Sequence, residues 1–284
     1  MTKSALLGYS VVALLVALSG CSGPRSMVWD GTVMERGQVG LAASQVVSLP
    51  GASLGAYLDV LSHGRDSLIG LTQVERREVE RATLASMLDM PGLATDLSAH
   101  VGIGWGVDLG LRYVAGNKGG DVRWQFLDGG RDDWNGGVGL GYTWNSVEAP
   151  TKAGEALGTT FKRSDLLLPV SFGKCHGSPG SFNGSSAIGL GMAWSHIEYG
   201  FAPEPYTDEL GNVVREAVPM HTQDYYSLGV QYSGRYGWKQ VALLLGTSIW
   251  HTDYGSYVLP GSDRPDLSLE GWTFVPSVGL DIRF

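Results

Sequence analysis

The sequence predicts an all-β protein, an antiparallel transmembrane β-barrel of about ten strands, and three observations support this prediction. From about residue 96 onward, apolar residues alternate with small or polar ones, which is the period of a β-strand. One face of each strand carries large apolar and aromatic residues, and the other carries glycine, serine and charged residues. The alternating segments are about as long as the 9–11 residues that a tilted membrane strand needs. In a membrane barrel the large residues face lipid and the small or polar ones face the lumen.

The composition excludes several other classes of protein. The chain has 284 residues, of which 43% are hydrophobic and 17% charged, and its formal net charge is −8. The mean hydropathy of +0.01 is far too low for a polytopic helical membrane protein. The 9 Trp, 12 Tyr and 7 Phe residues are too many for a disordered chain. An acidic balance gives no support for nucleic-acid binding, so no nucleic-acid partner is expected.

The alternation places ten strands, with eight or twelve as the alternatives because the first strand is the weakest. Their ranges are 38–48, 96–103, 107–115, 120–127, 136–145, 164–173, 185–200, 223–233, 238–252 and 271–284. At one end of the barrel, four of the five connections are long, namely 49–95, 146–163, 201–222 and 253–270, and the fifth, 116–119, is a short turn. The connections at the other end are shorter, at 104–106, 128–135, 174–184 and 234–237. Outer-membrane barrels have long external loops and short periplasmic turns, so we expect both termini in the periplasm.

The N-terminus has the features of a secretory signal. Lys3 precedes an apolar run over residues 5–18, which is too short for a comfortable transmembrane helix. The run ends in Leu18-Ser19-Gly20-Cys21, which resembles the lipobox of bacterial lipoproteins. The resemblance implies a signal peptide over 1–20, a covalent lipid such as palmitate on Cys21, and a lipidated periplasmic linker over 21–37. Several acyl chains would anchor the chain stably to outer-membrane lipid.

The last residues carry a second resemblance. Residues 277–284 end in an aromatic side chain, Phe284, with Ile282 two positions before it and Gly279 three positions before that. This arrangement resembles the β-signal that the barrel-assembly machinery reads in outer-membrane proteins. It implies that this machinery is a partner during biogenesis and that 38–284 forms an outer-membrane β-barrel. No family is recognised across the barrel itself.

One segment interrupts the alternation within the long insertion 49–95. Residues 72–90 predict a helix, because Thr72 and Glu75 form a capping-box pair and Pro91-Gly92 ends the segment. Parity places this helix in the first external connection or in the barrel mouth. A plug, a lid and a docking helix are the three interpretations.

Charged residues on the small-residue face of neighbouring strands predict a polar cluster in the lumen. The cluster comprises Asp96, His100, Asp108, Arg112, Asp121, Arg123 and Gln125. One interpretation is a salt-bridged barrel core, because buried charges are tolerated when they are paired. The other is a narrow conduit or a site for a small solute.

The catalytic and metal-site candidates are weak. Ser195 and His196 are adjacent, so their side chains point to opposite faces of a strand. The spacing of His251 and Asp253 resembles a dyad of the omptin proteases, but the carboxylate pair of that family is missing. The six histidines show no paired spacing typical of metal ligands. We therefore expect no catalytic site, no metal and no cofactor apart from the lipid, with a membrane-surface hydrolase as the second alternative.

These observations predict a lipid-anchored integral barrel of a Gram-negative outer membrane. Its expected role is structural or interactive, as a subunit of an envelope assembly with a protein partner. The first alternative is a solute-binding or conduit barrel that uses the charged lumen.

Overall fold

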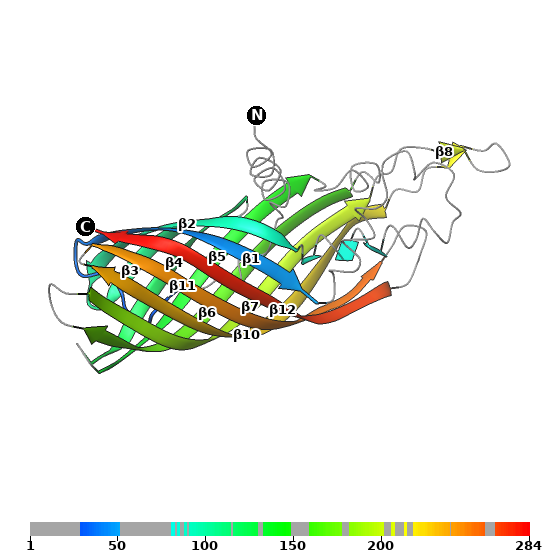
Figure 1. Ribbon diagram of the computed structural model, residues 1–284. Coiled ribbons are helices and arrows are strands. Elements are labelled where there is room, and N and C mark those ends of the chain that lie inside the picture. The colour runs from blue at the N-terminus through cyan, green and yellow to red at the C-terminus, as the bar shows by residue number, and fades with distance from the viewer. Residues whose placement is uncertain are drawn as a thin grey trace, which may run out of the picture.

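Ten strands form one closed antiparallel barrel in the part of the chain that the computed structural model describes (Figure 1). The described residues are 29–51, 81–82, 84–85, 88–89, 91–114, 116–129, 133–148, 159–177, 182–201, 206–207, 213–214, 218–238, 240–258 and 265–284. The strands are neighbours in the order β1-β12-β11-β10-β7-β6-β5-β4-β3-β2. The barrel closes where β1 pairs with β12, with Gly40 opposite Arg283 and Ser44 opposite Gly279. The predicted fold class and strand number are confirmed.

The barrel strands match the predicted ones closely and generally extend beyond them. They are β1 (Val39–Pro50), β2 (Gly92–Gly104), β3 (Val107–Val114), β4 (Asn117–Asp128), β5 (Trp134–Glu148), β6 (Thr159–Gly177), β7 (Phe182–Phe201), β10 (Val218–Trp238), β11 (Val241–Val258) and β12 (Pro265–Arg283). A separate two-stranded sheet pairs β8 (Tyr206–Thr207) with β9 (Val213–Val214).

The two ends of the barrel differ in the length of their connections, as predicted from the order of the strands along the sequence. At one end, which we call the short-turn end, brief connections join β2 to β3, β4 to β5, β6 to β7 and β10 to β11, and the C-terminus lies there (Figure 1). At the opposite, long-loop end, the connection from β1 to β2 and that from β7 to β10 are far longer.

Two predicted turns are wrong in position. Residues 234–237 belong to β10, and the chain turns after Trp238 instead. Asn117 and Gly119 belong to β4, so the turn after β3 is tighter than the predicted 116–119. In both cases the ladder to the neighbouring strand continues through residues whose small side chains had suggested a turn: Gly237 pairs with Ala242, and Gly119 with Thr143.

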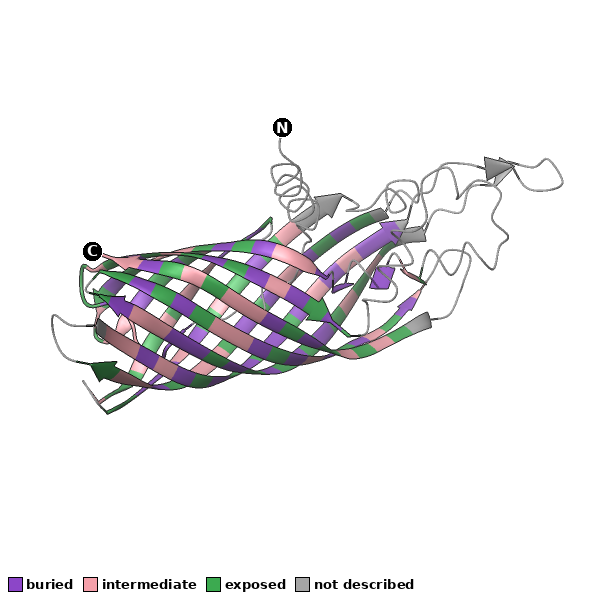
Figure 2. Cartoon of the chain, in the orientation of Figure 1, coloured by how far each residue is buried: buried purple, intermediate pink, exposed green. Residues whose placement is uncertain are grey.

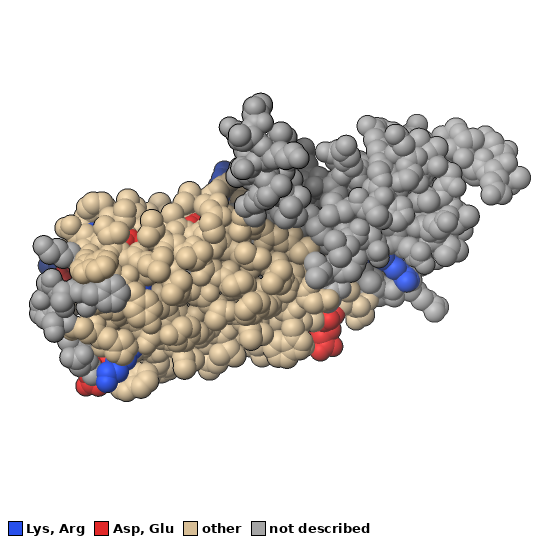
Figure 3. All heavy atoms as spheres, viewed as in Figure 1, with Lys and Arg blue, Asp and Glu red and all other residues tan. Residues whose placement is uncertain are grey.

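Burial alternates along every barrel strand, so the wall has an apolar outer face and a polar inner face (Figure 2). On the outer face Leu111, Ile188 and Leu228 are 71%, 63% and 63% exposed. On the face shown in Figure 3, the described charged side chains lie mostly towards the two ends. Aromatic residues on the outer face form two groups, with Trp144, Trp194, Tyr226 and Trp272 towards the long-loop end and Phe126, Trp134, Phe172, Trp238 and Phe284 towards the short-turn end.

The predicted signal peptide, Cys21 and most of the predicted helix 72–90 lie outside the described residues. Within the latter, Leu84 and Leu88 are helical. Of the helices in the described residues, none is both long enough and apolar enough to cross a membrane.

Candidate functional site

The predicted lumen cluster forms a set of ion pairs on the inner face of β2, β3 and β4. Arg112 Nε and Nη2 donate to the two carboxylate oxygens of Asp96 at 3.1 and 2.5 Å. Arg123 makes the same two-pronged contact with Asp108, at 2.8 Å for both bonds. Bidentate contacts of this kind are the strongest arrangement for a guanidinium and a carboxylate.

The remaining pair of the cluster reaches across one strand. His100 Nε2 on β2 lies 3.1 Å from Asp121 Oδ1 on β4, although β3 runs between them. Gly110 of β3 makes this contact feasible, because a Cβ there would lie 2.7 Å from Asp121 Oδ1 and would collide with the His100 ring. Glycine at this position therefore leaves the space that the pair occupies.

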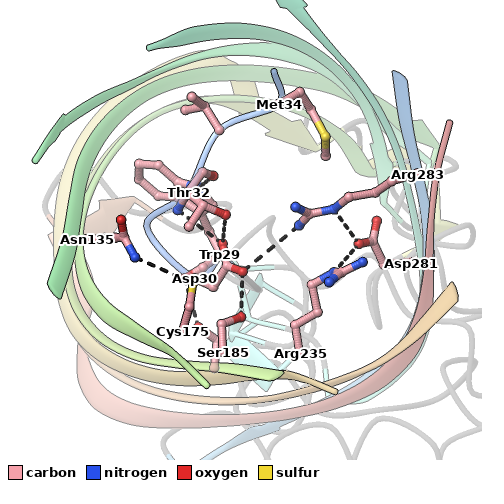
Figure 4. Close-up of polar contacts among 12 residues, drawn as sticks. Trp29, Asp30, Thr32, Met34, Asn135, Cys175, Ser185, Arg235, Asp281 and Arg283 are labelled. Carbon is pink, nitrogen blue, oxygen red and sulfur yellow. Dashed lines mark hydrogen bonds and ion pairs between the residues drawn. The ribbon is translucent and has the colours of Figure 1, made fainter. Parts of the chain in front are cut away.

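A segment that precedes the first strand enters the lumen at the short-turn end. Figure 4 shows Trp29, Asp30, Thr32 and Met34 inside the ring of strands. The carbonyl of Trp29 accepts hydrogen bonds from Ser171 Oγ of β6 at 3.1 Å and Ser233 Oγ of β10 at 2.8 Å. We call residues 29–36 the N-terminal plug. The sequence predicted a periplasmic linker over 21–37. In the structure, residues 29–36 of that range lie inside the barrel instead.

Asp30 ties the plug to two further strands, β7 and β12. Its carboxylate accepts hydrogen bonds from Ser185 Oγ and Thr32 Oγ1, both at 2.6 Å, and lies 4.0 Å from Arg283 Nη2 (Figure 4). Burial by itself raises the pKa of Asp30, but Arg283 and these hydrogen bonds outweigh it and hold the pKa below its ordinary value. The carboxylate is therefore charged at neutral pH and contributes a strong contact.

The charge cluster and the inner glycines also hold the plug. The backbone N–H of Met34 donates to Asp108 Oδ2 at 3.1 Å, and that of Val33 donates to Gln125 Oε1 at 3.1 Å. The Trp29 ring lies over Gly137 of β5, where a Cβ would approach the ring to 2.5 Å. Gly137 thus makes room for the indole, whereas a Cβ at Gly139 would meet Pro169 and Arg123 instead.

The long-loop end is filled by the described part of the predicted helix. Leu84 and Leu88 are fully buried. Arg163 of β6 donates to the Leu88 carbonyl at 3.1 Å, and Tyr254 of β11 donates to Asp89 Oδ2 at 2.5 Å. This part of the segment packs in the barrel mouth as a plug, so these residues do not present a free docking surface.

Small cavities lie beside the N-terminal plug. One of about 90 Å³ touches Trp29, His100 and Arg123, and a second of about 50 Å³ touches the same three residues. Thr143 Oγ1 lines the larger cavity and has no hydrogen-bond partner among the described residues. A wider hollow of about 510 Å³, lined in part by Asp30, opens at the short-turn end.

Several residues that hold the lumen were not predicted as site residues. Arg163 pairs with Asp165 at 2.8 Å, and Arg235 donates a hydrogen bond to Asp281. The pair of Asp281 and Arg283 was expected from the alternation of the last strand, and Arg283 does donate to Asp281. The inward parity of Arg163 and Asp165 was a signal available in the sequence. No comparable signal marks Trp29 and Asp30, because the plug has no period of two.

The catalytic candidates do not assemble. His251 Nε2 lies 3.0 Å from Glu270 on the outer wall, while Asp253 Oδ1 accepts the N–H of Gly255. Ser195 points inward and His196 outward, where His196 contacts Asp224 at 2.6 Å. Among the described residues, no three His, Cys, Asp or Glu side chains gather as metal ligands.

Comparison with known proteins finds similarity only to solved structures, since no protein-family model and no curated protein sequence matches the chain. The translocator domain of autotransporter NalP from Neisseria meningitidis aligns with 99% of this chain and 97% of its own, at 11% identity and a TM-score of 0.39. The outer membrane protease OmpT from Escherichia coli aligns with 87% of this chain and 94% of its own, at 8% identity and a TM-score of 0.37. Neisserial surface protein A aligns with 88% of this chain and 100% of its own, at 13% identity and a TM-score of 0.30.

Proposed function

We propose that this chain is an integral protein of the bacterial outer membrane with a structural or interaction role, anchored by its barrel and by a lipid on Cys21. The observation that carries the proposal is the belt of exposed large apolar side chains around a closed barrel, bounded at both ends by aromatic residues. Soluble proteins rarely expose apolar patches larger than a few hundred Å². In hydrocarbon the same belt is favourable, and closure satisfies the backbone hydrogen bonds of every strand.

The filled lumen favours a structural or interaction role over a conduit. The N-terminal plug occupies the short-turn end, and Leu84 and Leu88 occupy the mouth at the other end. The cavities of about 90 and 50 Å³ beside the plug have room for a few water molecules each, which is far less than an aqueous channel requires. The paired charges of the lumen then serve as a core that fixes the barrel and its plug.

The experiment expresses the full chain in a Gram-negative host and washes the membranes with alkaline carbonate. We expect the barrel to stay in the outer-membrane fraction and to migrate differently on gels before and after heating. The peptide that contains Cys21 is expected to carry the mass of attached lipid, and Cys21→Ala is expected to lose that mass but keep the barrel in the membrane. Cys175→Ala is the matched control and should retain the lipid.

Each part of the proposal has its own contradicting result. A wild-type chain released by carbonate would contradict membrane insertion. A Cys21 peptide without added mass would contradict the lipid anchor alone. The interaction role is checked by purification in mild detergent with mass spectrometry, where a stoichiometric partner or a self-assembled oligomer is expected.

A further inference from the structure

A polar pair lies on the outer wall, inside the apolar belt. Gln45 Nε2 of β1 donates a hydrogen bond of 3.0 Å to Thr95 Oγ1 of β2, and both side chains are exposed. Gln45 stands opposite Val278, midway along β12 between Trp272 and Phe284 of the two aromatic groups. Polar side chains that face hydrocarbon are expensive and tend to mark functional positions.

The hydrogen bond to Thr95 leaves the amide of Gln45 incompletely satisfied. A carboxamide has two N–H donors and an oxygen with two acceptor sites. Among the described residues, this bond is the one hydrogen bond that the Gln45 side chain makes. Acyl chains offer neither donor nor acceptor, so the oxygen and the second N–H need a partner that a protein supplies.

The surface beside the pair is suited to close approach by another protein. The outward residue before Gln45 is Ala43, and Ala99 lies two outward positions from Thr95 on β2. Both line an outer hollow of about 560 Å³, whose walls include Leu41, Leu97 and Leu280. Small residues at membrane interfaces let two backbones approach closely, and polar side chains then bond across the interface.

We propose that this face of β1 and β2 binds a second copy of the chain about a two-fold axis that passes near Gln45. A carboxamide is self-complementary, because each Gln45 donates its second N–H to the oxygen of the other and accepts one in return. A two-fold interface uses the same patch on both copies, which matches a single self-complementary group beside a hollow. Leu41 and Leu97 at the rim of one hollow would pack into the hollow of the other copy. The inference rests on the proposed membrane insertion and names the partner for the interaction role.

The first test uses disulfide capture of the full-length protein in its own membranes. Gln45→Cys and a control, Leu168→Cys, are each placed in a Cys175→Ala background and treated with a mild oxidant. Leu168 also faces outward, and its strand β6 lies farthest round the barrel from β1. We expect a disulfide-linked homodimer from Gln45→Cys and none from Leu168→Cys. No homodimer from Gln45→Cys, equal dimer from both positions, or capture of a different protein would each overturn the proposal.

A second measurement avoids the new cysteine. Fluorescence energy transfer between labelled copies is followed as the protein is diluted with lipid. We expect Gln45→Leu to weaken dimerisation about tenfold, in the range that hydrogen bonds between membrane segments contribute, while Ile188→Leu on β7 leaves it unchanged. Equal dimerisation by wild type and Gln45→Leu would overturn the role of the amide pair. A chain that resists carbonate but stays monomeric overturns this inference alone, whereas a chain released by carbonate overturns the proposed insertion as well.

Discussion

At the scale of single residues, the lumen depends on carboxylates that serve two partners each. Asp108 is fully buried, and it binds Arg123 of the wall and the backbone N–H of Met34 in the plug. Asp30 similarly joins the plug to Ser185 and Arg283. Such groups connect the wall and its filling, so a change in the wall is transmitted to the plug.

Replacement of Arg123 by Gln is expected to lower the free energy of unfolding by about 3–5 kcal/mol, because it leaves Asp108 buried without its counter-charge. The measurement is the urea midpoint of the purified barrel in detergent micelles, followed by tryptophan fluorescence. The double variant Arg123→Gln, Asp108→Asn is expected to recover most of the loss, because the amide oxygen still accepts the N–H of Met34. A single variant as stable as wild type would contradict the importance of this pair.

Alternation predicted which charged residues face the lumen, but it could not predict their partners. His100 contacts Asp121 two strands away, and this depends on the missing side chain of Gly110 between them. Arg112 instead pairs with Asp96 of the adjacent strand. The choice between such partners depends on the length of each side chain and on the space that its neighbours leave. The alternation of residues along a strand predicts neither of these.

At the scale of the strands, the closing seam sets a strict steric limit. Gly279 of β12 lies opposite Ser44 of β1, and a Cβ at Gly279 would collide with the Ser44 hydroxyl and the Ala43 carbonyl. A backbone oxygen cannot move aside without loss of strand pairing. The geometry of closure therefore requires a glycine at this position, independently of the β-signal that the sequence predicts here.

We expect Gly279→Val to reduce the folded fraction several-fold, because it separates β1 from β12. Refolding from urea into detergent micelles, without assembly machinery, isolates this steric effect, and the heat-modifiable gel band measures it. The neighbouring outward variant Val278→Ala is the control and should refold like wild type. Normal refolding of Gly279→Val would contradict this steric requirement.

Strand positions were predictable because each strand has one lipid-facing and one lumen-facing side, which imposes the alternation over its whole length. Strand ends were less predictable. Gly234 and Gly237 suggested a turn, yet β10 continues to Trp238 because its ladder with β7 and β11 is unbroken there. The N-terminal plug was missed because its shape depends on contacts with seven different strands of the wall rather than on local sequence.

At the scale of the whole molecule, two separate segments close the barrel. The N-terminal plug occupies the short-turn end, and the described residues of 81–89 occupy the long-loop end. We expect the wild-type protein to give no stepwise ion conductance in planar bilayers. Deletion of 29–36 alone leaves the long-loop filling in place, and deletion of 81–89 alone leaves the plug, so each single deletion should also be silent or nearly so. The combined deletion is expected to conduct.

All four proteins must first show heat-modifiable migration, so that conductance is compared among folded barrels. Stepwise conductance from the wild type would contradict the closed lumen and favour the conduit alternative. Silence of a folded double deletion would show that side chains of the wall close the lumen by themselves.

The N-terminal plug also has a consequence for the order of events during biogenesis. The carbonyl of Trp29 finds its partners on Ser171 and on Ser233, the latter 204 residues further along the chain. Contacts over such separations form slowly, since the intervening chain must first be brought together. The plug also contacts Arg283 of β12, the strand that closes the barrel against β1, so its contacts are complete only when the last strands are in place. The residues that are synthesised early are thus among the last to acquire their hydrogen bonds.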